Sequence, residues 1–350
     1  MNIESILEGW LLNVVFIFLI SFIGIFLGLL YKGFDRKISA MMQSRIGPPI
    51  IQPFRDVRKL LTKETIVPEN AIEWIFNGAP IIALIAPLVA LMYLPIGPFS
   101  PLLEGYGDLI LVLYLLAIPA IAMAVGGFSS SSPYATVGAQ REVVLMMSYE
   151  LPLAISAITV AWKMNEIVGP ETNPFSLQVI SSNPIWGHVG LIGGLGIALI
   201  VFTLFAVLPG ELSKEPFGQA KAKTEIADGV FVEYTGRNLG LFYIANTVQM
   251  IVLASLIITL FFPYQLSNLL ERWIILQGPI LPIVEMGVWA LLVDVVFYLF
   301  KLLLIIYFGV SLVRVAFARF QIDKASYFYW VPISIIGLLG LLFVVVGATV

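Results

Sequence analysis

The sequence contains no cysteine and a single histidine, His188, among its 350 residues. Iron–sulfur clusters are usually held by cysteine thiolates, and haem iron needs an axial His, Cys, Met or Tyr ligand. The chain is therefore a poor candidate for holding a redox centre, and we expect no cofactor and no metal site in it. The same absence excludes disulfides and cysteine-based zinc sites. His188 lies at the edge of an apolar run and is interpreted as an interfacial polar residue.

Charge is also scarce. Charged residues make up 12% of the chain, hydrophobic residues make up 59%, and the mean hydropathy is +0.98, whereas a soluble domain carries about 25% charged residues. Uncharged apolar runs recur at lengths close to the ~20 residues that a helix needs to cross the hydrocarbon core. They lack the alternation of an outer-membrane barrel. These features predict an all-α polytopic membrane protein in a lipid bilayer, with no nucleic-acid partner.

About eight runs are long enough to span the membrane, and we treat residues 1–350 as a single membrane domain. The first run is too long for a signal peptide, and the residues before it include acids rather than a basic region. The expected spans cover residues 11–31, 74–94, 109–127, 143–162, 187–207, 239–262, 287–312 and 328–348.

The basic residues predict the orientation of the chain. Of its 19 lysines and arginines, 16 fall in the loops after odd-numbered spans and 2 in the loops after even-numbered spans. Because cytoplasmic loops are enriched in Lys and Arg, the odd loops are expected in the cytoplasm and both termini outside. The expected location is the cell (plasma) membrane, with inner loops 32–73 and 208–238 facing peripheral partners.

The first inner loop contains an amphipathic stretch after two prolines, Pro48 and Pro49. Such a pattern is typical of a helix that lies in the membrane surface. Its role stays open between anchoring to anionic lipid headgroups and forming a lid over a cavity shared with a peripheral partner. One helical face carries Phe54, Val57, Leu60 and Leu61, and the other carries Arg55, Arg58 and Lys59.

Several ionisable residues fall where lipid is expected. An ionised side chain at the centre of a spanning helix costs on the order of 2.5–3.5 kcal/mol, so it normally faces protein or water. Glu142 and Glu150 project to roughly the same side of the fourth span. Asp294 and Lys301 share one stripe of the seventh span about 10 Å apart, too far for direct contact. An interhelical ion pair remains open for these two residues.

Titratable groups in low dielectric suit proton transfer, because desolvation raises the pKa of a carboxyl group toward neutrality. The second inner loop adds five acids that topology does not require. We predict that the following residues line a proton path or cavity, with structural ion pairs as the alternative: Glu142, Glu150, Glu211, Glu215, Glu225, Asp228, Glu233, Asp294 and Lys301.

Short motifs along nearly the whole chain resemble the NADH dehydrogenase subunit 1 family, which comprises the H-type subunits of respiratory complex I and their hydrogenase-type relatives. The first inner loop follows the family order ERK…MQxRxGP…LLxKE, and later stretches resemble GAxR…SYE, PFD…E(L/I)xxG…EYSG and RxxxPRxRxD. The matching stretches are 35–37, 42–48, 60–64, 138–141, 148–150, 216–217, 225–229, 233–236 and 314–323.

The resemblance implies a subunit that sits where a hydrophilic electron-transfer arm meets a membrane arm. Glu150, Glu225 and Glu233 would be acids of the path or cavity. The expected partners are peripheral iron–sulfur and hydrogenase-like large subunits, which hold the clusters, and antiporter-like membrane subunits. The residues expected to face the partners are Arg36, Arg45, Arg55, Arg58, Lys221 and Lys223.

One loop departs from the family pattern. After Pro216-Phe217 the family usually continues Asp-Leu-Pro-Glu-Ala-Glu, whereas residues 218–223 read Gly-Gln-Ala-Lys-Ala-Lys. Because this loop lines the quinone entrance in the family, the change argues against quinone reduction. Together with the extra acid Glu142, it favours the branch of archaeal-type membrane-bound hydrogenases and sulfane sulfur reductases.

Three functions are compared on this basis. The leading one is a non-catalytic anchor and coupling subunit that links ferredoxin-linked redox chemistry in a peripheral arm to proton or sodium translocation. A quinone-site subunit of an NADH dehydrogenase shares the fold and differs in electron acceptor. A standalone proton or sodium transporter would explain acids in spans, but the long charged loops and the lack of internal repeats argue against it.

Overall fold

The computed structural model describes residues 3–103, 109–169, 172–267 and 287–349, and within these ranges the chain is almost entirely helical. Eight helical stretches are long and apolar enough to cross a membrane, which confirms the predicted all-α fold and span number for the described residues. Six are single helices: α1 (Ile3–Met42), α3 (Glu73–Tyr93), α4 (Leu109–Ser129), α5 (Pro133–Val168), α7 (Leu191–Glu211) and α9 (Gly236–Phe261).

The last two spans are composite. α11 (Gly287–Ile306) continues through the π-helix η5 (Tyr307–Leu312) into α12 (Val313–Ala316). α13 (Ile322–Phe328) continues through a second π-helix, η6 (Tyr329–Ile333), into α14 (Ser334–Thr349). Single-turn π segments inside α-helices are rare and occur frequently at functional sites.

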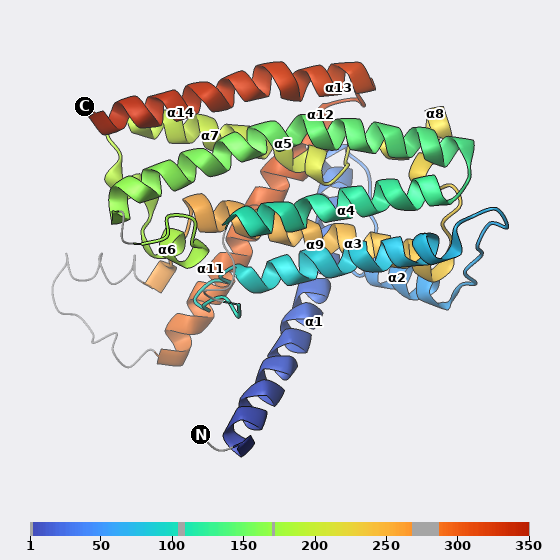
Figure 1. Cartoon of the computed structure of the whole chain (residues 1–350), viewed down its shortest axis with the longest axis horizontal. Helices are drawn as coiled ribbons and strands as arrows, with labels where there is room; N and C mark the ends of the chain where they lie inside the picture. Colours follow the sequence, from blue (N-terminus) through green and yellow to red (C-terminus); the bar gives the residue numbers. More distant parts are fainter. Residues whose placement is uncertain (1–2, 104–108, 170–171, 268–286, 350) are drawn as a thin grey trace.

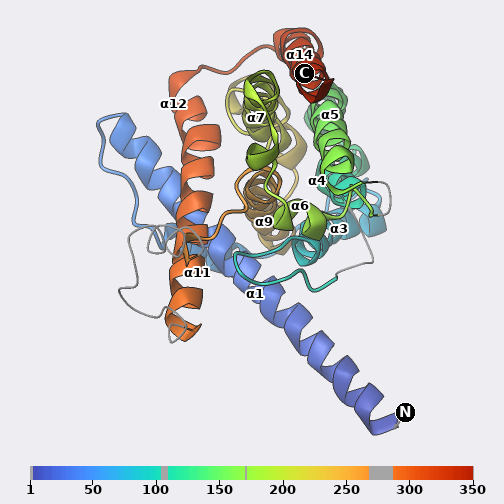
Figure 2. The same cartoon turned by 90° about the vertical axis from the view of Figure 1, so that its left-hand side faces the viewer.

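Helix α9 forms the centre of the bundle. It packs against α1, α3, α4, α7 and α11, and 94% of its most apolar stretch is buried, against 22% for α1. Figures 1 and 2 show α3, α4, α5, α7, α9 and α14 running side by side, with α1 and α11 along one flank and the N-terminal half of α1 projecting from the bundle. The projecting half must therefore meet lipid or another chain.

Short elements gather at one end of the bundle, which we call the loop end (residues 43–72, 212–235 and 317–321). They are α2 (Gln52–Thr62), η2 (Gln219–Lys221), α8 (Lys223–Ile226) and η3 (Gly229–Phe231); α2 and α8 lie at this end in Figure 1. Helix α2 packs on α1 and α9, with Val57 buried and Arg55 and Arg58 exposed. The predicted amphipathic helix is therefore present.

Two helix boundaries differ from the prediction by ten residues or more. Helix α1 runs to Met42 rather than to residue 31, and α5 begins at Pro133 rather than at 143. Asp35 and Arg36, which we placed in a loop, lie on α1. Hydropathy ended the two spans at charged residues, but the protein accommodates these charges. On α1, Asp35 is buried and pairs with Arg314, and Arg36 pairs with Asp56 on α2. On α5, Glu142 is buried and accepts a hydrogen bond from Ser213, so both helices continue past their charges.

Small residues let α7 and α14 approach closely. A Cβ on Gly196 would lie 2.7 Å from the carbonyl oxygen of Gly340, and one on Gly347 would lie 2.5 Å from the nitrogen of Gly193. A Cβ on Gly194, in contrast, would meet nothing within 4 Å. Close approach through small residues is a common way to pack helices in lipid.

Candidate functional site

Two buried carboxylates face one small cavity near the loop end. Glu142 on α5 and Glu211, the last residue of α7, are 1% and 3% exposed. The hydroxyl of Ser213 donates to Oε1 of Glu142 at 2.6 Å, and Nε2 of Gln249 donates to Oε1 of Glu211 at 3.3 Å. The second oxygen of each carboxylate is buried and has no partner at hydrogen-bond geometry among the described residues, although the hydroxyl of Tyr149, which also lacks such a partner, lies close to Glu211.

The cavity has a volume of about 20 Å³ and is lined by both acids, Ser213 and Lys221. A space of this size holds on the order of one water molecule. Buried polar atoms normally have a partner, so two orphan oxygens beside such a space mark a place where water or protons are accommodated. This is the strongest candidate site in the described part of the chain.

Lys221 lines this cavity, although we grouped it with the partner-facing residues. Its Nζ lies 5.1 Å from the centroid of the Phe231 ring. Burial lowers the pKa of Lys221, while the negative charges of Glu142, Asp228 and Glu215 oppose that shift. The loop that carries it lies directly on α5 because Gly138 has no side chain; a Cβ there would lie 2.6 Å from the nitrogen of Val230.

The remaining acids of the second loop lie nearer the surface. Glu225 pairs with Arg141 at 2.5 Å, and Glu215 pairs with Arg319 at 3.2 Å, each glutamate side chain being 48% exposed. Asp228 lies 3.7 Å from Lys223, whose side chain is 78% exposed. Glu233 is half-buried. The structure thus separates the surface acids from the buried pair, and exposed pairs of this kind typically contribute less than about 1 kcal/mol to stability.

Glu150 lies on α5 in a third environment. It is half-buried and lines an apolar groove of about 310 Å³ together with Tyr114, Leu153 and Phe175. Among the described residues it makes no hydrogen bond or ion pair. A carboxylate beside an apolar groove in a membrane protein requires a neighbouring chain or water.

Asp294 and Lys301 are not brought to the buried acids. They line a separate cavity of about 70 Å³ near the C-terminal end of α9. Asp294 accepts hydrogen bonds from the backbone nitrogen and hydroxyl of Ser267, whereas Lys301 donates to the carbonyls of Phe262 and Tyr264 at 2.9 Å each. Each is satisfied without the other, and Lys301 binds carbonyls of the segment that directly follows α9.

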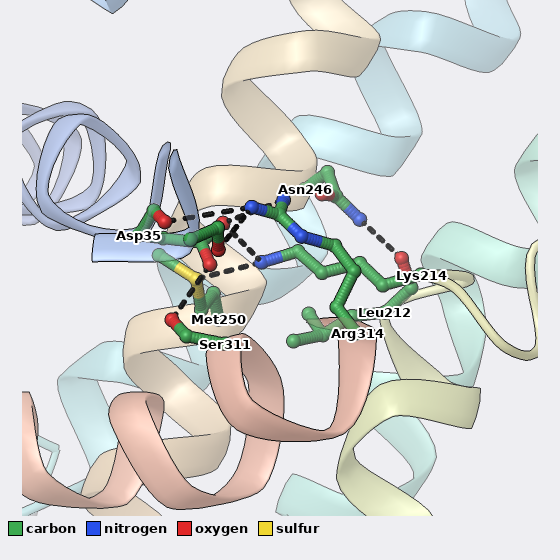
Figure 3. Close-up of polar contacts among 8 residues, drawn as sticks. Asp35, Leu212, Lys214, Asn246, Met250, Ser311 and Arg314 are labelled. Atoms are coloured by element: carbon green, nitrogen blue, oxygen red, sulfur yellow. Dashed lines mark hydrogen bonds and ion pairs between the residues drawn. The ribbon is translucent and has the colours of Figure 1, made fainter. Parts of the chain in front are cut away.

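A buried charge cluster, which the sequence did not reveal, joins three parts of the fold (Figure 3). The fully buried carboxylate of Asp35 on α1 accepts from the hydroxyl of Ser311 on η5 at 2.8 Å and from Arg314 on α12 at 3.1 Å. Nζ of Lys214 lies 3.6 Å from the same carboxylate. Burial lowers the pKa of Lys214, and the charge of Asp35 opposes that shift.

This cluster is one residue away from the carboxylate cavity. Lys214 directly follows Ser213, whose hydroxyl binds Glu142, and the preceding carbonyl of Leu212 accepts from Asn246 on α9. Ser213 adopts a left-handed conformation (φ +45°), which turns the chain between the two sites. A displacement of this turn would therefore move groups at both sites.

Arginines line a larger cavity on the other side of the cluster. It measures about 550 Å³, and Arg36, Arg45, Arg314 and Arg319 contribute to its wall with Glu215. Arg36 also bonds Asp56 on α2 at 2.7 Å, which ties α2 to α1. Arg45 is exposed and forms no ion pair among the described residues. The cavity opens beside exposed apolar residues, Ile46 and Phe317.

Comparison with known proteins identifies the family. The profile of the NADH dehydrogenase family matches residues 14–345. The chain belongs to the NADH dehydrogenase family. It is 29% identical over 323 residues to the H-type subunit of the NADH-quinone oxidoreductase of Syntrophotalea carbinolica, covering 88% of this chain and 87% of that protein. It is 32% identical over 266 residues to hydrogenase-4 component C of Escherichia coli, covering 75% and 78%.

Among solved structures, a chain of the membrane-bound sulfane sulfur reductase, an archaeal respiratory membrane complex, matches with a TM-score of 0.77 and 30% identity. The match covers 95% of this chain and 99% of that chain. With eight apolar helices, this chain of the NADH dehydrogenase family is therefore a multi-pass membrane subunit of a complex I-like assembly. The resemblance on its motifs is confirmed at the level of family.

The structure shows where two residues that depart from the family pattern, Lys221 and Glu142, lie. Lys221, where the family usually carries an acid, lies in the cavity of Glu142 and Glu211. Glu142, the extra acid, is its buried neighbour. Both of these positions, at which the sequence departs from the pattern that it resembles, therefore line one cavity.

Proposed function

We propose that this chain is the membrane anchor and coupling subunit of its complex, docking a peripheral electron-transfer arm and linking redox chemistry to proton or sodium translocation. One observation carries the proposal: Ser213, whose hydroxyl binds the buried Glu142, directly precedes Lys214 of the Asp35–Lys214–Arg314 cluster, and the buried Glu211 precedes Lys214 by three residues. Arg314 of this cluster also lines the open cavity at the loop end. Motion imposed on that surface has a direct covalent route to titratable groups.

The proposed orientation places the loop end in the cytoplasm and both termini outside the plasma membrane. The support is the concentration of Lys and Arg in the loops that gather at this end. A terminal tag that reacts with a membrane-impermeant reagent in intact cells is expected. A tag that reacts only after lysis would contradict this orientation.

The proposed peripheral partners are iron–sulfur and hydrogenase-like large subunits at the loop end. The support is an exposed surface that combines apolar Ile46 and Phe317 with exposed Arg45 and the basic face of α2. Aromatic, apolar and arginine residues together are typical of protein interfaces. Antiporter-like membrane subunits would cover the apolar groove of Glu150.

The proposed branch is ferredoxin-linked, either hydrogenase or sulfane sulfur reductase, with the electrons carried in partner chains. It is supported by the relatives in hydrogenase-4 and sulfane sulfur reductase and by the Lys221 substitution. A quinone-reducing NADH dehydrogenase is the second candidate, favoured by the cavity of about 550 Å³ at the loop end. Reduction of added quinone by the purified complex would decide for the second candidate.

The coupling role is tested with carboxyl-to-amide variants of the whole complex. In liposomes, Glu211→Gln and Glu150→Gln are expected to keep electron transfer but to lose most of the ion gradient, because an amide cannot exchange a proton. Glu69→Gln, an exposed loop residue, is the matched control and should behave as wild type. A normal gradient in both variants would make these acids structural only.

Purification and liposome assays also distinguish the coupling subunit from a standalone transporter. The proposal predicts that iron–sulfur subunits co-purify with the chain under gentle solubilisation and that the chain alone moves no ions in liposomes. Active ion transport by the isolated chain would contradict the coupling role.

A further inference from the structure

The carboxylate cavity holds two acids and one base. Glu142 and Glu211 are almost completely buried, each with one oxygen that lacks a partner among the described residues, and Lys221 lines the same space. Lys221 forms no ion pair within 4.0 Å of either carboxylate in the described part of the chain. The cavity that the three groups help to line has room for about one water molecule.

Charge balance restricts the occupancy of this cavity. Two ionised carboxylates and one ammonium leave a net charge of −1, and an uncompensated buried charge is strongly unfavourable. Adding one proton makes the cavity neutral, whereas adding a second makes it +1. With the ammonium of Lys221 present, the two carboxylates together are therefore expected to hold one proton. Without that ammonium they would hold two.

We propose that Lys221 sets the proton capacity of the cavity to one, so that one of Glu142 and Glu211 is ionised and the other is protonated, with a bridging water between them. This inference deepens the proposed coupling function. It rests on that function only in assuming that the bound proton takes part in coupling. Lys221 acts as a positioning charge; the proton is exchanged by the carboxylates.

The ammonium of Lys221 has acidic neighbours on two sides. Lys221 has Glu142 on its inner side, and Glu215 and Asp228 close to the surface on its outer side. It is carried by the three-residue turn η2, so a shift of the loop would transfer the ammonium from the inner acid toward the outer ones. Other ionisable groups near the cavity are Tyr149, Glu150, Lys214 and Tyr329.

The inference is tested by counting protonated carboxyl groups by infrared spectroscopy of the purified complex at neutral pH. Wild type should show one buried C=O band from the pair, and Lys221→Gln should show two. Lys221→Arg, which keeps the charge, should retain one band, and Lys223→Gln, at an exposed position in the same loop, should also retain one.

A second pair of variants covers the case in which Lys221→Gln does not assemble. Glu142→Gln alone should have no band, because Glu211 is then balanced by Lys221. Glu142→Gln combined with Lys221→Gln should regain one band. Each of these differences follows from charge balance and not from a loss of packing, and assembly is checked by size-exclusion chromatography.

Several results would overturn the inference. Equal counts in wild type and Lys221→Gln would show that the ammonium does not limit protonation. Loss of the wild-type band when sodium replaces potassium in the buffer would show that a metal cation, rather than a proton, balances the cavity. If the band counts hold but Glu211→Gln still couples normally, the coupling function fails while the capacity rule stands. If Glu211→Gln loses coupling but the band counts differ from those expected, the capacity rule fails while the coupling function stands.

Discussion

At the scale of single residues, Asp35 is the counter-charge for one buried cation, Lys214, and one partly buried cation, Arg314. Its carboxylate pairs with Arg314 and Lys214 and accepts from Ser311. The DRK stretch that contains it is visible in the sequence, but its partners lie about 180 and 280 positions away. No local pattern indicates such a pairing, and for that reason the cluster could not be predicted.

Asp35→Asn should destabilise the protein by about 3–5 kcal/mol, because removing one partner of a buried ion pair leaves charge uncompensated. The measurement is thermal or denaturant unfolding of the purified protein in detergent. Asp56→Asn is the matched control: it breaks the half-exposed pair with Arg36 and should cost about 1 kcal/mol or less. Equal losses in the two variants would contradict the proposed weight of the cluster.

The acids show what residue-level reasoning can and cannot separate. Glu142 and Glu211 were predicted as members of a larger acidic set, and the structure places them in one cavity. Glu215, Glu225 and Asp228 have the same chemistry but are engaged in surface pairs. Burial, which depends on how the loop folds back over α5, distinguishes the two groups, and composition does not carry that information.

At the scale of helices, the hydropathy pattern correctly predicts each span, whereas the packing faces are less predictable. The spacings Gly24–Gly28 and Gly190–Gly194 both match the small-xxx-small pattern. A Cβ on Gly28 would meet the backbone of Thr247 on α9 at 2.9 Å, yet Gly194 faces open space. A spacing indicates that a close approach is allowed, not that a neighbour lies there.

Gly196→Ala should therefore separate α7 from α14 and cost about 1–3 kcal/mol, as overpacking typically does, because the new methyl group would meet backbone atoms that cannot move aside. Gly194→Ala, two residues away on the same helix, should change stability by no more than about 0.5 kcal/mol. Both are measured by unfolding in detergent. Equal stabilities of the two variants would show that α7 and α14 can move apart at little cost in free energy.

The two π-helical segments could not be read from the sequence either. η5 presents Ser311 to Asp35, and Tyr329 of η6 donates to the carbonyl of Ala206 on α7. Both therefore contact elements that hold the carboxylate cavity or its neighbouring cluster. A wider helical turn depends on these long-range contacts, which residue propensity does not encode.

At the scale of the whole molecule, the loop end is the surface best suited to hold a partner. If Ile46 and Phe317 are anchors of that interface, Ile46→Glu or Phe317→Glu should weaken peripheral-subunit binding by at least about 2 kcal/mol, roughly 30-fold. Pull-down of the peripheral subunits at several salt concentrations measures the effect.

The control for this interface carries the same substitution at the other end of the bundle. Leu191 begins α7 there and is 91% exposed. Leu191→Glu should leave peripheral-subunit binding unchanged, since a charge at a helix end can reach the interfacial region. Binding that survives both loop-end variants would place the interface elsewhere.

The burial of α9 also constrains how the chain is made. This helix carries Asn238, Asn246 and Gln249, whose side chains bond to α3, to the residue after α7 and to α4 and α7. During synthesis it enters the bilayer after most of these neighbours but before α11, so one flank faces lipid until the final quarter of the polypeptide (residues 262–350) arrives. A ribosome stalled after Phe261 would consequently leave an unfinished bundle, and quality-control proteases would be expected to remove it.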